Sequence, residues 1–478
     1  MSEEISIKKA ALINFVSKYS NIFIQILYMA ILARILDPDD FGVVAIITVF
    51  TTFFTLFADM GFGAALIQNK KLIKSDIESI FSFSFYLALA LGVAFSIFSI
   101  PLSILYGNNV YKSLGLILSF SLFFNTLNTV PNALLLKNKK FIVVGIRSVV
   151  VNIMSSILTV ILAYAGLKYY ALTINSVFTA LFTFLWNYKN MPIKFKFKFD
   201  KESIMKIKSY SGYLFGFNII NYFSRNLDNL LLGKFMGDIP LAYYDKAYRL
   251  MLYPVQNLTH VVTPVLHPIL SEYQDNKKYI YDKFMITIKV LSLLGIFVSI
   301  YCYFATDEII LIVFGEKWRN SIPCFKWLSL SIWAQMVNTT SGSIFQALGK
   351  TKLQFVRGIV VAIITITSIL IGLSSGDLAK VSQWVAIAYN LHFISMLYFL
   401  IHLAFKESSI DFCKKLIPHV VIAIIMVIGM NVGNLINIDE VFLSAIYKGM
   451  VCLAVYVFGI VITREHKLLI NLVKRKKN

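Results

Sequence analysis

Apolar segments of about 20 residues recur from one end of the chain to the other, with short polar connections between them. A helix of that length crosses the hydrocarbon core of a bilayer, and no connection is long enough to form a soluble domain. The pattern therefore predicts an all-α, polytopic membrane protein of about 14 transmembrane helices. The predicted spans are residues 10–33, 41–66, 79–105, 111–135, 142–165, 169–188, 209–233, 243–270, 284–305, 322–347, 354–373, 381–404, 412–434 and 441–462.

Composition supports a membrane-embedded chain. Of 478 residues, 58% are hydrophobic and only 15% are charged, whereas a soluble protein of this size needs more surface charge. The four cysteines have no metal-binding or redox spacing, and isolated apolar thiols are expected. The sequence indicates no metal site, no cofactor and no catalytic residue.

The distribution of charge predicts the orientation of the chain. The formal net charge is +20, but the basic residues gather in alternate connections, and the intervening connections are short and acidic. Lysine and arginine mark cytoplasmic loops, so both termini are expected in the cytoplasm and no nucleic-acid partner is expected. One basic connection alternates lysine with phenylalanine over residues 194–199. It is either an interfacial segment on anionic membrane lipid or a solvated linker with incidental aromatic residues.

Two parts of the chain repeat the same pattern. Asn128-Thr129 is followed by a basic break and then Arg147, and Asn338-Thr339 is followed by a basic break and Arg357 about 210 residues later. An even number of spans in each copy predicts parallel halves, the arrangement used for alternating access. The expected organisation is an N-terminal six-helix lobe (1–190), a cytoplasmic basic linker (191–208), a C-terminal six-helix lobe (209–405), and two extra helices with a basic cytoplasmic tail (406–478).

Ionisable residues inside spans are costly and suggest function. The basic ones are candidates for a water-filled cationic cavity that binds a phosphate-bearing substrate, since arginine suits bidentate phosphate contact. The alternative is that these long side chains snorkel to lipid headgroups, or that Arg225 and Asp228 neutralise each other at i and i+3. Asp59 is a candidate for proton coupling or for helix packing. The candidate substrate-binding residues are Lys18, Arg147, Arg225, Arg249, Lys289 and Arg357, and the candidate coupling or pairing acids are Asp59 and Asp228.

Several segments resemble bacterial polysaccharide transporters, the repeat-unit flippases of O-antigen, exopolysaccharide and teichuronic acid. They are residues 32–45 (Leu-Ala-Arg-Ile-Leu-Asp-Pro-Asp-Asp-Phe-Gly-Val-Val-Ala), 59–68, 228–234, 243–250 and 314–318. This family lies within the multidrug/oligosaccharidyl-lipid/polysaccharide (MOP) exporter superfamily. The resemblance implies a V-shaped, two-lobed exporter in the bacterial cytoplasmic (inner) membrane. It also implies that an undecaprenyl-pyrophosphate-linked oligosaccharide is flipped to the outer leaflet, with a polysaccharide polymerase and glycosyltransferases as partners.

Three alternatives stay open. A lipid II flippase shares the span number and the anionic cargo. A drug or cation antiporter of the same superfamily is less favoured because the first span contains no carboxylate. A membrane glycosyltransferase or polymerase would use Asp37, Asp39 and Asp40, but an N-cap at Asp39 or Asp40 explains the same residues.

Overall fold

The computed structural model describes residues 2–59, 72–259 and 276–468, together with residues 63, 66, 67, 69, 273 and 470. Of residues 2–15, 59, 206–221 and 224, it describes the backbone alone. The described chain is helical and contains no β-strand, which confirms the predicted fold class. It divides into two compact units, Met1–Ala242 and Tyr243–Asn478.

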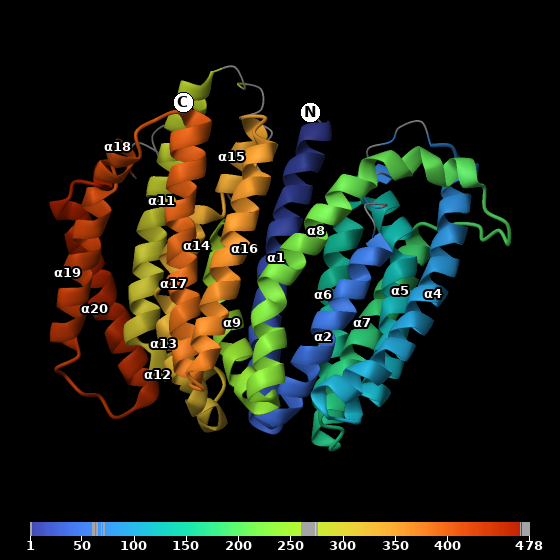
Figure 1. The fold of residues 1–478 in the computed structure, drawn as a ribbon, viewed down its shortest axis with the longest axis horizontal. Helices are drawn as coiled ribbons and strands as arrows, with labels where there is room; N and C mark the ends of the chain where they lie inside the picture. Colours follow the sequence, from blue (N-terminus) through green and yellow to red (C-terminus); the bar gives the residue numbers. More distant parts are fainter. Residues whose placement is uncertain are drawn as a thin grey trace. The chain divides into compact units, whose positions relative to one another are not determined.

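The first unit is a group of long helices around α5. This helix packs against α4 on one side and α7 on the other, α1 packs against α6, and α8 contacts α2 and α4 (Figure 1). Buried residues of α4 and α5, among them Phe81 and Val130, form its core. The helices are α1 (Ser2–Ile35), α2 (Pro38–Asp59), α4 (Lys74–Tyr106), α5 (Val110–Lys137), α6 (Phe141–Tyr164), α7 (Tyr169–Asn190) and α8 (Lys201–Met236), and α9 (Asp238–Thr259) begins within this unit.

The second unit contains the remaining helices. α16 and α17 run side by side, and α19 and α20 pack on each other and on α11 (Figure 1). A core of aromatic and aliphatic side chains, including Phe284, Phe405 and Phe412, joins α11 to the segments that follow α17. The helices are α11 (Lys277–Phe304), α12 (Thr306–Val313), η1 (Glu316–Ser321), α13 (Ile322–Ser329), α14 (Ile332–Asn338), α15 (Ser341–Ala347), α16 (Thr351–Ser374), α17 (Leu378–Met396), η2 (Leu397–Phe405), α18 (Ser409–Lys414), α19 (Ile417–Gly433) and α20 (Val441–Ile462).

Ten of the predicted spans are helices long and apolar enough to cross a membrane within the described residues. Of the other four, 209–233 lies inside the charged helix α8, and 412–434 contains α19, which has 17 residues. The span 243–270 begins in α9, and its part beyond Thr259 lies outside the described residues. The fourth, 322–347, differs from expectation.

Residues 322–347 form three short helices, α13, α14 and α15, instead of one continuous helix. Hydroxyl side chains near the breaks donate to backbone carbonyls: Ser329 to Lys326 (2.8 Å), Ser331 to Leu328 (2.6 Å), and Thr339 to Met336 (2.6 Å). Such local bonds compete with the helical ladder. The hydropathy of this stretch correctly indicates burial but not continuity.

The start of α2 corrects the expected position of its cap. The helix begins at Pro38, so Asp39 and Asp40 lie in its first turn and Asp37 precedes it. The Asp40 Oδ2 accepts a hydrogen bond from the backbone N–H of Asp37 at 3.2 Å, as the third residue of a capping box does. Asp40 therefore has a structural role in capping the start of α2.

Gly42 allows α2 to approach the beginning of α9 within the first unit. A Cβ at this position would collide with the backbone carbonyl of Asp238. We expect Gly42→Ala to cost roughly 1–3 kcal/mol of stability, as overpacking usually does. The measurement is the thermal unfolding temperature of the purified protein in detergent. Gly358→Ala in α16 is the control, because a Cβ there meets open space. Equal unfolding temperatures for the two variants would contradict the prediction.

Candidate functional site

Arg147 is bound by asparagines from the two neighbouring helices of its unit. From α6, its Nη1 donates to the Oδ1 of Asn132 in α5 (3.0 Å) and to the Oδ1 of Asn187 in α7 (2.6 Å). Asn187 is fully buried and in turn donates to Asn128 at 2.7 Å. The guanidinium therefore points into its own helix group, where side-chain amides accept its hydrogens.

Arg357 in α16 has the corresponding environment in the second unit. Its Nη2 donates to the Oδ1 of Asn338 (3.0 Å) and to the backbone carbonyl of His392 (3.3 Å). Its Nη1 donates to Ser341 at 2.9 Å, and its Nε donates to Ser395 at 3.2 Å. Like Arg147, it joins the helix before it to the helix after it.

Both arginines are held entirely by neutral acceptors. No carboxylate of the described chain forms an ion pair with Arg147 or Arg357, and both side chains are only partly exposed. A guanidinium has five N–H donors, and Arg147 uses only those of Nη1 toward described residues. Each group thus keeps its positive charge, and Arg147 retains donors for water or an anionic ligand.

A polar stripe runs along α1. Lys18, Asn21, Gln25 and Tyr28 stand at i, i+3, i+7 and i+10, which places them on one face of the helix. Lys18 is half-buried, and its Nζ forms no hydrogen bond or ion pair with any described residue. Polar and charged groups inside a span face a protein interior or a water-filled path, because lipid cannot solvate them.

The middle of this stripe is fixed by α6 and α7. The Asn21 amide donates to Ser148 (3.1 Å) and accepts from Asn152 (2.9 Å), both in α6. Tyr28 accepts from the Asn175 amide of α7 at 2.8 Å. These bonds orient the stripe, on which Gln25 is exposed and Lys18 is half-buried.

The same spacing recurs in α8, 200 positions later in the sequence. Asn218, Asn221, Arg225 and Asp228 stand at i, i+3, i+7 and i+10, although the side chains of the first two lie outside the described residues. Arg225 is exposed and Asp228 is buried. Asp228 accepts from the backbone N–H of Asn229 at 2.9 Å.

Two other predicted cations are paired with carboxylates. The Arg249 Nε lies 2.9 Å and 2.7 Å from the two carboxylate oxygens of Asp245, one turn earlier in α9. The Lys289 Nζ in α11 lies 3.5 Å from the Oε1 of Glu465, which is buried and also lies 4.0 Å from His419. Both cations are therefore neutralised within their own unit. Asp59 ends α2, and its side chain lies outside the described residues.

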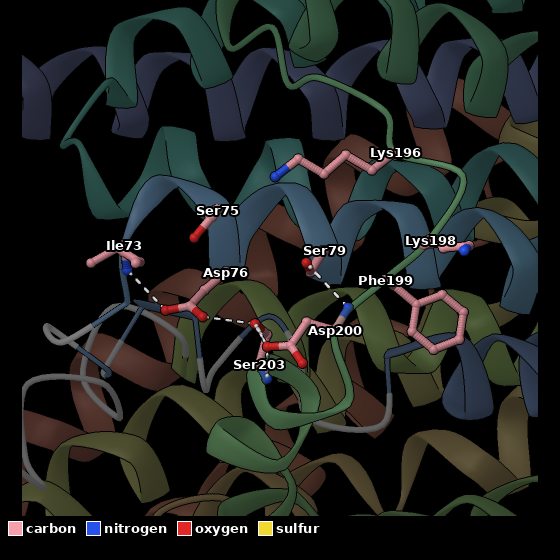
Figure 2. A pocket seen from close by; sticks show the side chains of 9 residues that line it. All are labelled: Ile73, Ser75, Asp76, Ser79, Lys196, Lys198, Phe199, Asp200 and Ser203. Atoms are coloured by element: carbon pink, nitrogen blue, oxygen red, sulfur yellow. Dashed lines mark hydrogen bonds between the residues drawn. The ribbon is translucent and has the colours of Figure 1, made fainter.

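A cavity of about 490 Å³ lies where α4 and α8 begin (Figure 2). Its two carboxylates already stabilise helix starts: Asp76 accepts from the Ile73 N–H (3.1 Å) and the Ser203 hydroxyl (2.7 Å), and Asp200 accepts from the Ser203 N–H (3.2 Å). Figure 2 shows these bonds joining the two helix starts. The acidic side of the cavity is a structural junction.

The roles of some residues in this arrangement could not be predicted from the sequence. The 3-4-3 spacing in α1 and α8 is visible in the sequence and could have indicated the two polar faces. The sequence contains no comparable pattern at Asn187 or Glu465, because each of them interacts with a cation that lies far from it along the chain. The described cysteines are free, as expected for isolated thiols, and Cys302, Cys324 and Cys452 are buried.

Comparison with known proteins places this chain in a family. Residues 31–323, more than half of the chain, match the family of polysaccharide biosynthesis proteins. The chain belongs to this family. Among its relatives is the teichuronic acid biosynthesis protein TuaB of Bacillus subtilis, 24% identical over 86% of this chain and 85% of that protein. Another is the lipopolysaccharide biosynthesis protein WzxC of Escherichia coli, 25% identical over 72% of this chain and 70% of that protein.

Solved structures show the same fold. The lipid II flippase MurJ in an inward closed conformation superposes with a TM-score of 0.76 at 17% identity, over 95% of this chain and 99% of that chain. A multidrug resistance MATE transporter of the MOP superfamily has a TM-score of 0.63 at 15% identity, over 83% of this chain and 95% of that chain. The chain is thus a multi-pass membrane protein with the fold of this superfamily, as its sequence predicted.

Proposed function

We propose that this protein is a flippase for an undecaprenyl-pyrophosphate-linked oligosaccharide repeat unit in surface polysaccharide biosynthesis. It moves the lipid-linked unit from the cytoplasmic to the outer leaflet by alternating access. Membership of the polysaccharide biosynthesis family supports the cargo class. The observation that carries the proposal is the polar stripe of α1, which combines amides inside a span with a lysine that forms no ion pair with a described residue.

The chemistry of the stripe suits such a cargo. A pyrophosphate needs cations whose charge is not already neutralised. Among the described residues, no carboxylate forms an ion pair with Lys18, Arg147, Arg225 or Arg357. Side-chain amides both donate and accept, so Asn and Gln side chains beside the cations suit sugar hydroxyls. The polyprenyl chain remains in the surrounding lipid.

The remaining candidates take other roles in this proposal. Arg249 and Lys289 would have to leave Asp245 and Glu465 before binding phosphate, so their roles are structural: Arg249 pairs within α9, and Lys289 links α11 to the chain that follows α20. Asp59 and Asp228 are the candidates for ion coupling. The protein sits in the bacterial inner membrane with both termini in the cytoplasm, and it hands its product to a polymerase after glycosyltransferases have built the repeat unit.

The rival function with most support is flipping of lipid II. It is favoured by the fold shared with MurJ over 95% of this chain. At 17% identity this likeness concerns the fold alone, whereas the family match concerns polysaccharide biosynthesis. Drug or cation antiport is disfavoured because residues 10–33 contain no carboxylate.

Transport by the purified protein in vesicles distinguishes these functions. We expect fluorescent undecaprenyl-pyrophosphate tetrasaccharide to cross the bilayer at least about tenfold faster than in protein-free vesicles, a factor worth about 1.4 kcal/mol. Accessibility of the label to an external quencher measures the rate, and labelled lipid II and ethidium are the comparison substrates. Lipid II crossing faster than the tetrasaccharide lipid would favour the rival flippase, and ethidium uptake alone would favour the antiporter.

A further inference from the structure

The segment between α7 and α8, residues 191–200, packs along α4 and is held there by hydrogen bonds and an ion pair. The Tyr86 hydroxyl donates to the backbone carbonyl of Phe197 (2.9 Å), and the Lys196 N–H donates to the Ser82 hydroxyl (2.9 Å). The Lys196 Nζ pairs with Glu78 at 2.9 Å. Residues 201–208, which the sequence assigned to a linker, already belong to α8. The α7–α8 segment is therefore a short non-helical connection that is held against α4.

Aromatic packing decides which ring of this segment is exposed. The Phe195 ring lies 5.0 Å from that of Phe85, and the Phe199 ring lies 5.3 Å from that of Phe83. Phe197, between them, keeps 85% of its surface exposed. A largely exposed phenylalanine on a segment with a fixed position is an apolar group presented to its surroundings.

The position along α4 indicates what those surroundings are. The helix has 33 residues, whereas about 20 suffice to cross the hydrocarbon core. Its exposed apolar side chains form one stripe that begins beside the segment at Tyr86 and continues along the helix at Leu89, Val93, Ile97, Ile100 and Ile104. Because the apolar stripe starts at Tyr86, the α7–α8 segment lies at the level where the hydrocarbon core meets water. Tyrosine and other aromatic residues are enriched at that level.

The charges beside Phe197 indicate which kind of molecule this part of the segment would bind. Lys194 and Lys198 are exposed, and neither forms a hydrogen bond or ion pair with a described residue. Lys196 is engaged by Glu78, and the nearby carboxylates of Asp76 and Asp200 are engaged as helix caps. Lys198 also lines the cavity at the start of α4 and α8 (Figure 2). Two ammonium groups that form no hydrogen bond or ion pair with a described residue thus lie on either side of one exposed ring.

We propose that this surface, formed by Lys194, Phe197 and Lys198, binds anionic phospholipid. The ammonium groups contact headgroup phosphates, and the Phe197 ring inserts among the upper acyl carbons. An amphipathic segment with lysines at phosphate level and an aromatic ring below binds anionic bilayers in this manner. The connection between the two repeats is thereby attached to the bilayer, whatever cargo the protein carries.

Lipid retained by the full-length protein tests this site. The protein is equilibrated in nanodiscs of phosphatidylglycerol and phosphatidylcholine, extracted and washed in detergent, and its retained lipids are quantified by mass spectrometry. We expect Lys194→Gln/Lys198→Gln to lower the retained ratio of phosphatidylglycerol to phosphatidylcholine by about fivefold or more, because each lysine near the membrane surface adds to the attraction for anionic lipid. Phe197→Ser should lower retention of both lipids. The thermal unfolding temperature of each variant should equal that of the wild type.

The matched control removes the same charge elsewhere. Lys277→Gln/Lys278→Gln changes two exposed lysines at the start of α11 and should leave the ratio unchanged. An unchanged ratio in the first variant, or an equal fall in the control, would overturn the proposal. Full displacement of phosphatidylglycerol by inorganic phosphate would also overturn it, because the site would then bind the free anion and not a lipid surface.

Discussion

Replacing Lys18 with glutamine is expected to slow flipping of the lipid-linked oligosaccharide by roughly 10- to 100-fold, because a hydrogen bond to a charged group contributes about 1.5–3 kcal/mol. Lys18 forms no ion pair with a described carboxylate, so its removal leaves no buried charge without a partner. The loss should therefore appear in transport and not in folding. Lys18→Arg, which keeps the charge, should retain most of the rate.

Lys289→Gln is the comparison variant for this prediction, because its expected effect is on stability. Lys289→Gln removes the partner of the buried Glu465, so it should lower the thermal unfolding temperature. Each variant is measured for its initial flipping rate in vesicles and for its unfolding temperature in detergent. A wild-type rate for Lys18→Gln at normal protein level would remove Lys18 from the site. A lower unfolding temperature for that variant would instead assign Lys18 to the fold.

The helical architecture was predictable because it depends on local composition. Runs of apolar residues specify spans whatever their neighbours are, and ten spans appear where hydropathy placed them within the described chain. The exception, residues 322–347, breaks where Ser331 and Thr339 bond to nearby carbonyls. Hydropathy averages over such hydroxyl groups, so it does not detect the breaks.

The candidate site was predictable only in part. The repeat spacing predicts equivalent positions for Arg147 and Arg357, and in the structure each arginine bonds to the helix before it and to the helix after it. Their acceptors come from other helices, such as Asn187 of α7 for Arg147, and the sequence does not show which side chains those helices bring close. The same limit applies to Lys289, whose partner Glu465 is 176 residues away. Charge along a sequence identifies costly groups, but tertiary structure determines which of them are neutralised.

Asn187→Leu is expected to have the largest effect on stability among substitutions near the two arginines. Asn187 is fully buried and accepts the 2.6 Å bond from Arg147, so leucine leaves the guanidinium with Asn132 as its one described acceptor. Loss of a hydrogen-bond acceptor for a half-buried guanidinium costs roughly 1.5–3 kcal/mol. The expected result is a markedly lower unfolding temperature. Ser395→Ala beside Arg357 is the control and should cost less, because three described acceptors remain there.

Removing both partners separates the structural role of Arg147 from its proposed role in transport. In Arg147→Met/Asn187→Leu no guanidinium is left without acceptors, so the unfolding temperature should recover above that of Asn187→Leu alone. Residues in direct contact show coupling of about 0.5–3 kcal/mol in such cycles. If Arg147 also binds the pyrophosphate, the double variant folds but flips its cargo as slowly as Arg147→Met. Recovery of both stability and flipping would assign Arg147 to helix packing alone. Additive losses of stability would show that the Arg147–Asn187 bond contributes little to the free energy of unfolding.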